Sequence, residues 1–203
     1  MNIKMTTVYF IRHAEADNTD DDGRNRPLTE KGMKDRAVVT AFLQDKKIDT
    51  VFSSPYKRAI DTLTDFTEKN GFYIETNEDF REQKAGSWRK HNVGSWIEEY
   101  DYFITVVCKK QSTDFTYKYP NGESLFEVQE RNIKALNDVL SRCKNKNIVI
   151  GTHGAALSTI IRYFDPTFGY DDFIAMLGKV PWAVKMVFNE SAFVSMERID
   201  LVQ

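Results

Sequence analysis

Two histidines stand directly after short apolar runs, where a side chain can do chemistry. Arg12-His13 follows the run at residues 7–11, and His153 follows the run at residues 147–152. Each run predicts a buried strand, and the carboxyl ends of strands in open α/β sheets are where ligands bind. One such histidine would suit a structural role, but two in the same topological position favour a shared site. We therefore expect both imidazoles at one rim of a sheet.

An arginine at the start of a predicted helix and a glutamate in a predicted loop are further candidates for this site. Arg58 falls in the first turn of a helix predicted to begin at Ser54-Pro55, where backbone N–H groups attract anions. Together with Arg12 it could hold a phosphate between two guanidinium forks. Glu82 lies in a later loop and becomes the candidate acid/base if that loop folds over the rim. Taken alone, either side chain would suit a solvated surface.

Four short motifs occur in a fixed order along the chain. They are Arg12-His13, Ser53-Ser54-Pro55-x-x-Arg58-Ala59 followed by Thr62, Glu82-x-x-x-Gly86-x-Trp88, and His153-Gly154. Each motif is weak alone, but the four in this order and in these strand and helix contexts are specific. Between residues 7 and about 165 the chain resembles the histidine phosphatase superfamily, with its phosphoglycerate mutase-like fold.

The resemblance implies a phosphohistidine mechanism. His13 would be the nucleophile, and Arg12, Arg58 and His153 would hold the phosphoryl oxygens and balance their charge. Glu82 would protonate the leaving alcohol and then take a proton from the attacking water. The positive groups would take the place of a metal ion, so no metal and no cofactor is expected. The implied reaction is the metal-independent hydrolysis of a phosphate monoester.

Three more residues are implied as substrate contacts, and the chain departs from the family pattern near them. Thr152 stands where serine often precedes the late histidine, and Gly154 follows that histidine. Asn18 sits one position from the asparagine that some members place on the phosphate. Ala14 replaces a more common glycine but is small enough for close backbone approach. Arg-Lys at residues 89–90 replaces a frequent Glu-Gly, which leaves the leaving-group specificity open.

The segment after the Glu82 motif bears on the choice between hydrolysis and phosphotransfer. In the family that this chain resembles, the mutases are longer chains with a large basic insertion in this region. Here residues 89–122 predict a cap of moderate length, rich in aromatic and acidic residues, and residues 120–124 resemble the phosphatase branch. The sequence therefore favours a phosphatase, with a mutase-type phosphotransferase as the alternative.

The side chains of the cap and of one earlier loop have two interpretations each. The aromatic and histidine residues of the cap could line the substrate or pack the cap against the domain; they are Trp88, His91, Trp96, Tyr100, Tyr102, Phe103 and Tyr117. Arg24 and Arg26 could reach a second anionic group, or pair with the acidic residues 20–22.

Two readings from other functional classes remain open. One is a metal-dependent hydrolase that uses His13, His91 and His153 together with carboxylates, although no compact ligand spacing is present. The other is a non-catalytic phosphate-binding module. Chelator sensitivity would reveal the first, and phosphate binding without turnover would reveal the second.

Composition excludes several broader classes. The 203 residues carry 28 Lys and Arg against 30 Asp and Glu, and 41% of them are hydrophobic. This balance argues against a disordered chain and against a general nucleic-acid binder. No apolar run suits a secretion signal or a membrane span, and Cys108 and Cys143 suit reduced, packed thiols. We expect a cytoplasmic protein whose partner is a small phosphorylated metabolite.

The remaining pattern predicts the elements that position these residues. Apolar runs alternate with helical patterns, which is typical of an α/β fold: a three-layer α/β/α sandwich around a mostly parallel sheet. Strands are expected at residues 7–11, 49–53, 72–76 and 147–152, helices at 29–42, 54–69, 95–110, 124–143 and 155–164, and a hairpin at 182–199. We expect one domain over residues 1–203, and the hairpin could offer a sheet edge for a homodimer.

Overall fold

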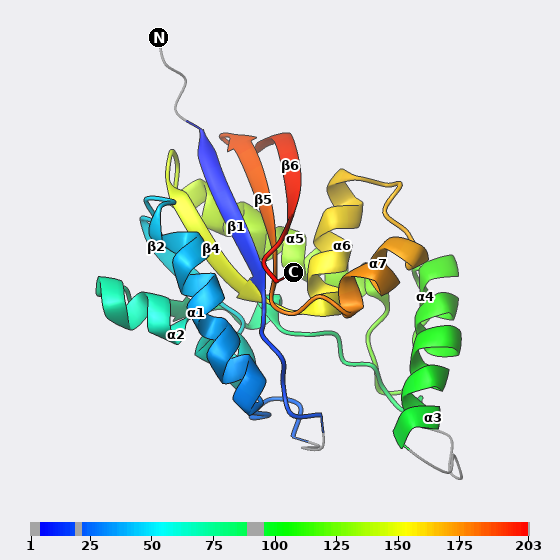
Figure 1. The fold of residues 1–203 in the computed structure, drawn as a ribbon. Helices are drawn as coiled ribbons and strands as arrows, with labels where there is room; N and C mark the ends of the chain where they lie inside the picture. Colours follow the sequence, from blue (N-terminus) through cyan, green and yellow to red (C-terminus); the bar gives the residue numbers. More distant parts are fainter. Residues whose placement is uncertain (1–4, 19–21, 89–95, 203) are drawn as a thin grey trace.

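A six-stranded sheet forms the centre of the molecule (Figure 1). The computed structural model describes residues 5–18, 22–88 and 96–202. The strands are β1 (Thr6–Arg12), β2 (Thr50–Ser53), β3 (Ile74–Thr76), β4 (Asn147–Thr152), β5 (Trp182–Asn189) and β6 (Ala192–Asp200). Their spatial order is β3-β2-β4-β1-β5-β6, with β1 to β4 parallel and β5 antiparallel to both neighbours. The predicted mostly parallel sheet is confirmed.

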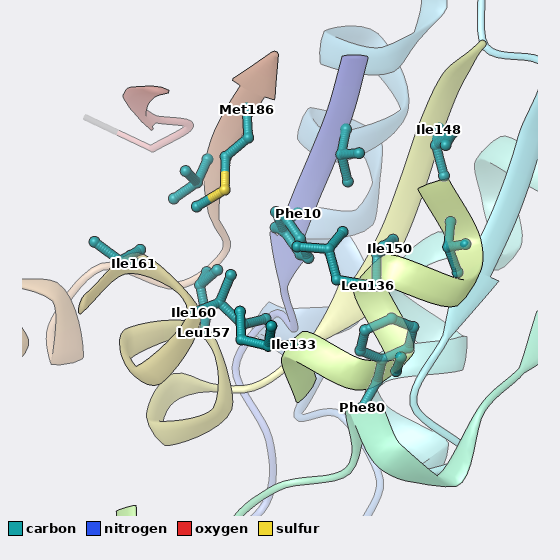
Figure 2. Close-up of a cluster of buried hydrophobic side chains, with 14 of the residues drawn as sticks. Phe10, Phe80, Ile133, Leu136, Ile148, Ile150, Leu157, Ile160, Ile161 and Met186 are labelled. Atoms are coloured by element: carbon teal, nitrogen blue, oxygen red, sulfur yellow. The ribbon is translucent and has the colours of Figure 1, made fainter. Parts of the chain in front are cut away.

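Helices cover both faces of this sheet. They are α1 (Glu30–Gln44) and α2 (Lys57–Asn70) on one face, and α5 (Leu125–Arg142) and α6 (Gly154–Phe164) on the other. Successive strand residues point to opposite faces, so Val8 and Phe10 pack with α5 and α6 whereas Tyr9 and Ile11 pack with α1 and α2. Figure 2 shows the first of these clusters around Phe10. The three-layer α/β/α architecture is confirmed.

The helix ends follow local side-chain chemistry. The hydroxyl of Thr29 accepts a hydrogen bond from the N–H of Gly32, as the sequence predicted for the start of α1. Gly71 ends α2 with a positive φ of 70°, which glycine adopts at little cost. Ser124 and Glu127 form a reciprocal capping box at the start of α5.

Two predicted elements differ from the structure at their ends. The helix predicted from residue 54 begins at Lys57, because the Ser54 hydroxyl accepts the N–H of Tyr56 and holds an extended turn before the helix. The strand predicted at residues 72–76 begins only at Ile74, because the ring of Phe72 turns inward and stacks on Phe66. Both changes shorten elements without moving them in the fold.

The region predicted as one helix over residues 95–110 is less regular than expected. It consists of α3 (Trp96–Tyr102), a π-helical segment η2 (Phe103–Cys108) and α4 (Lys109–Thr113). A further helix, α7 (Tyr170–Leu177), was not predicted because its short apolar pattern runs into the apolar strand that follows. In the part of the chain that the structure describes, no helix combines the length and the apolar character that crossing a bilayer needs.

Candidate active site

The ends of β1 and β4 bring the two histidines together. Arg12 pairs with Thr152 in the parallel register, so His13 and His153 follow at neighbouring strand ends. Their ring centroids lie 5.2 Å apart. The backbone N–H of His13 donates to the backbone carbonyl of Thr152 over 3.1 Å. The expected common rim is therefore present.

The His13 ring is held in one tautomer. Its Nδ1 lies 2.7 Å from the carbonyl oxygen of Ala14, which can only accept, so Nδ1 carries the proton and Nε2 carries the lone pair. Arg58 Nε donates to that Nε2 over 3.1 Å. Burial, followed by the charges of Arg58 and Arg12, lowers the pKa of His13 well below its usual value. The ring is therefore a neutral base whose unprotonated nitrogen, Nε2, accepts a hydrogen bond from the Arg58 guanidinium.

Arg58 is tied to the loop that follows His13. Its Nη1 donates to the carbonyl of Gly23 over 2.6 Å, and its guanidinium lies over the ring of Tyr56. The Thr62 hydroxyl, one turn later, accepts the N–H of Ala14 and donates to the carbonyl of Arg58. The Arg58…Thr62 spacing of the motif thus joins the first turn of α2 to the histidine loop.

The Arg12 side chain is buried, and one of its guanidinium nitrogens donates to backbone carbonyls. Its Nη1 donates to the carbonyls of Met176, Leu177 and Lys179, at 2.6, 3.2 and 3.3 Å, at the end of α7. Its Nε is buried and has no hydrogen-bond partner among the described residues. Burial lowers the pKa of Arg12 to about 10, so the side chain stays cationic at neutral pH. An unpaired cationic donor at this rim suits an anion.

His153 lies behind His13 and is completely buried. Its Nε2 is 2.7 Å from the Ser54 hydroxyl, and its ring packs against Tyr56. Its Nδ1 lacks a hydrogen-bond partner among the described residues. Burial, with Arg58 as the next cause, lowers its pKa well below the usual value. If the Ser54 hydroxyl donates to Nε2, Nδ1 carries the proton and is a buried donor.

The loop that carries Glu82 folds over the rim. The two carboxylate oxygens of Glu82 accept the N–H groups of Ala155 and Ala156, over 3.3 and 3.1 Å, at the start of α6. Its negative charge partly offsets the lowering of the pKa of Arg12 and Arg58 that burial causes. The position at a helix N-terminus suits a carboxylate, and the expected approach of Glu82 to the site is present.

Arg131 of α5 fastens this loop, and sequence reasoning missed it. Its guanidinium donates to the carbonyls of Asp79, Arg81 and Glu82 and pairs with Glu123. Burial raises the pKa of Glu123, but its bonds to Arg131 and to the backbone N–H of Lys84, with the charges of Arg131 and Arg81, together lower it. An arginine inside a helical pattern carries no sign of such a long-range role, because its partners are backbone carbonyls of another segment.

A cavity of about 340 Å³ opens at these groups. We call one part the catalytic end, which comprises Arg12, His13, Asn18, Arg26, Arg58, Glu82 and Gly154. We call the other part the apolar arm, which comprises Phe103, Cys108, Phe115, Leu125, Phe168, Phe173, Leu177 and Val180. His153 and Thr152 are not on the wall. The cavity therefore joins a charged region to an apolar one.

The three implied substrate contacts have different surroundings. Gly154 borders the cavity where the backbone passes Arg12. Asn18 also borders it, and its side-chain oxygen accepts a hydrogen bond from Arg26. Thr152 does not reach the cavity: its hydroxyl is fully buried between sheet and helices, because β4 directs that side chain into the interior. Only the carbonyl of Thr152 takes part, through His13.

The loop arginines and the cap side chains divide between their two interpretations. Arg24 pairs with Glu78 away from the cavity, whereas Arg26 lies on its wall. Of the cap aromatics, Tyr100 and Phe103 line the cavity, and Trp88 packs on Phe103. His91 and the side chain of Trp96 lie outside what the structure describes.

Comparisons with known proteins agree with this geometry. Residues 8–175 match the histidine phosphatase superfamily (branch 1). Phosphoserine phosphatase 1 of Hydrogenobacter thermophilus is 26% identical over 73% of this chain and 71% of its own. The 2,3-bisphosphoglycerate-dependent phosphoglycerate mutase of Methanococcus vannielii is 23% identical over 91% of both chains.

The fold has close counterparts among solved structures. A mycobacterial glucosyl-3-phosphoglycerate phosphatase superposes with a TM-score of 0.71 over 96% of this chain and 97% of that one, at 15% identity. At that identity the superposition speaks for the fold alone, while the family match spans most of the chain. The chain belongs to the histidine phosphatase superfamily and is an enzyme of the phosphatase type, with the related mutase activity as the alternative.

Proposed function

We propose that this enzyme is a metal-independent phosphatase that hydrolyses a small phosphate monoester through a phosphohistidine on His13. The observation that carries the proposal is the state of that ring: Nδ1 is bound to the Ala14 carbonyl, and the neutral Nε2 sits beside Arg58 at the cavity. A nucleophilic nitrogen and a cation meet at the same point, as attack on a phosphoryl group requires.

In the first step the Nε2 lone pair forms a bond to phosphorus while the bond from phosphorus to the ester oxygen breaks. Glu82, in its protonated form, gives that proton to the departing alkoxide, and Arg12 and Arg58 stabilise the negative charge on the phosphoryl oxygens. In the second step Glu82 takes a proton from water, the water oxygen attacks phosphorus, and the P–N bond returns its electrons to Nε2. Inorganic phosphate leaves, and Glu82 is again protonated.

The cavity supports hydrolysis over phosphotransfer between two positions of one metabolite. A mutase must hold a second phosphate close to the first while its ligand reorients. Outside the catalytic end, the wall is mainly apolar, with side chains such as Phe103 and Leu177. Such a wall offers few donors to a second phosphate close to the first, since charged groups need partners when they leave water.

The test is hydrolysis of p-nitrophenyl phosphate in the presence of EDTA, comparing the wild type with His13→Asn. We expect activity that survives the chelator and falls by at least about 10⁴-fold in the variant, because the covalent route is lost. Lys57→Ala serves as the control, since Lys57 pairs with Asp61 on the exposed side of α2. Chelator-sensitive activity, or an active His13→Asn, would contradict the proposal.

The same proposal places the enzyme in the cytoplasm, acting on a small metabolite. Both cysteines are free in the structure, which suits a reducing compartment. Fractionation of cells that express the tagged protein tests the compartment, and recovery in a membrane or extracellular fraction would oppose it. Incubation with 3-phosphoglycerate and its bisphosphate would expose mutase activity.

A further inference from the structure

One face of α6 runs the length of the cavity. Gly154, Ser158 and Arg162 follow at intervals of four residues, and all three line the cavity. At 1.5 Å per residue, Arg162 lies about 12 Å along the helix from Gly154. Arg12 and Glu82 contact the start of this helix. The helix therefore has the reacting groups at one end and a second arginine at the other.

The rest of the wall is mainly apolar, and its two glutamines, Gln83 and Gln111, are hydrogen-bonded to each other. The segment η2 inserts a π turn, so that Phe103 and Cys108, five residues apart, both face the cavity. Phe173 and Leu177 of α7 line it as well. A mainly aliphatic or aromatic leaving group suits this region best, since polar atoms would lose water and gain few partners.

Arg162 is a half-buried cation that has no carboxylate partner in the described part of the chain. Its Nη1 donates to the carbonyl of Phe168 over 3.3 Å, and its guanidinium lies 4.9 Å from the centre of the Phe115 ring. Both of these neighbours line the cavity. Within the described residues Arg162 forms no ion pair, so most of its five N–H donors are available to a ligand.

The acids at this corner are already engaged by another arginine. Arg198 of β6 pairs with Asp165 over 2.9 Å and with Asp172 over 3.2 Å. Asp172 also accepts the N–H of Gly169 at the start of α7. Both carboxylates are thus paired with Arg198, and among the described residues neither forms an ion pair with Arg162.

We propose that Arg162 binds a second anionic group on the substrate, and this rests on the proposed phosphatase function. The substrate class is a phosphate monoester whose leaving alcohol carries a carboxylate or another phosphate at its far end. A mainly apolar spacer of somewhat less than about 12 Å joins the two, because helical side chains lean toward the helix N-terminus. Phe115 and Phe168 orient the guanidinium toward that group.

The test compares two esters that differ only at the far end. One is n-octyl phosphate, and the other is the same chain ending in a carboxylate, with shorter homologues to find the best length. For the wild type we expect kcat/KM to favour the carboxylate ester by about 10- to 100-fold, the range of a hydrogen bond between charged groups. Arg162→Met should abolish that preference, leave n-octyl phosphate unchanged, and be partly rescued by Arg162→Lys.

Arg142→Met is the matched control, since Arg142 pairs with Asp138 and Glu75 outside the cavity. Equal kcat/KM for the two esters in the wild type, or equal losses in Arg162→Met, would overturn the proposal. Calorimetric titration with the non-hydrolysable phosphonates of both chains measures anion binding without turnover. If neither ester is hydrolysed but the carboxylate phosphonate still binds more tightly through Arg162, the phosphatase function fails while the anion site stands.

Discussion

The two parts of the cavity are held in different ways. At the catalytic end, backbone carbonyls or backbone N–H groups hold Arg12, His13, Arg58 and Glu82. In the apolar arm, side chains such as Phe103 and Leu177 are placed by helix packing alone. The first arrangement determines angles and distances, whereas the second determines mainly a shape.

This difference separates the reaction from the choice of substrate. Phosphoryl transfer depends on position and charge, so its groups must be held by directional bonds. An apolar leaving group gains free energy from burial, which is non-directional and proportional to area. Variants at the catalytic end should therefore change kcat, and variants in the arm should change KM. Three of the following predictions test that separation, and one tests the protonation state of the two histidines.

The largest effect is expected for Glu82→Gln, which removes the acid/base. With an alkyl phosphate, kcat should fall by about 10²–10⁴-fold. With p-nitrophenyl phosphate the loss should be much smaller in the first step, because p-nitrophenolate leaves without a proton. Steady-state and burst kinetics on both esters measure this, with Glu75→Gln on β3 as the control. Equal losses in the bond-breaking step would contradict the role of Glu82.

The arm is tested by Phe103→Ala. Burying one large apolar side chain contributes about 1.5–3 kcal/mol, so KM for n-octyl phosphate should rise by roughly 10- to 100-fold while kcat stays within a few-fold. Val106→Ala is the matched control, because Val106 lies in the same π-helical segment but is 41% exposed. A fall in kcat with unchanged KM would contradict the assignment of substrate binding, rather than the reaction, to the apolar arm.

The lowered pKa values of the two histidines predict a pH-dependent stability. The pKa values of His13 and His153 are lowered in the folded protein, so below about pH 6.5 the unfolded chain binds more protons. The free energy of unfolding should fall with decreasing pH by up to about 1.4 kcal/mol per pH unit for each histidine. Urea unfolding of the wild type and His153→Gln between about pH 7 and about pH 5 measures the difference. Identical slopes would argue against a buried neutral His153.

The smallest effect is expected for Ser54→Ala, which removes the partner of His153 Nε2. A hydrogen bond of this kind contributes about 0.5–1.5 kcal/mol, so kcat should fall by about 3- to 10-fold. KM for n-octyl phosphate should not change, since the arm is intact. Ser141→Ala on the exposed face of α5 is the control. A selective rise in KM would show that Ser54 acts on the arm instead.

Much of the catalytic end could be predicted because its residues lie next to element ends. Arg12 and His13 end one apolar run, His153 ends another, and Arg58 opens a helix. Strand ends of a parallel sheet meet at one rim, so local pattern and topology suffice to bring these residues together. The alternation of strands and helices likewise predicted the three layers.

The arm and the fastening of the Glu82 loop depended on tertiary structure. Arg131, Arg162 and the π turn at Phe103–Cys108 act on partners from distant segments. Periodicity assigned the apolar cap residues to a helix but not to a face, because one inserted residue rotates every side chain that follows. The sequence by itself determined the fold class and the reacting groups, through local periodicity and chain order. Only the packing of α3, α4, α6 and α7 around one space decided which side chains line the cavity, since a cavity wall is built from residues far apart in the chain.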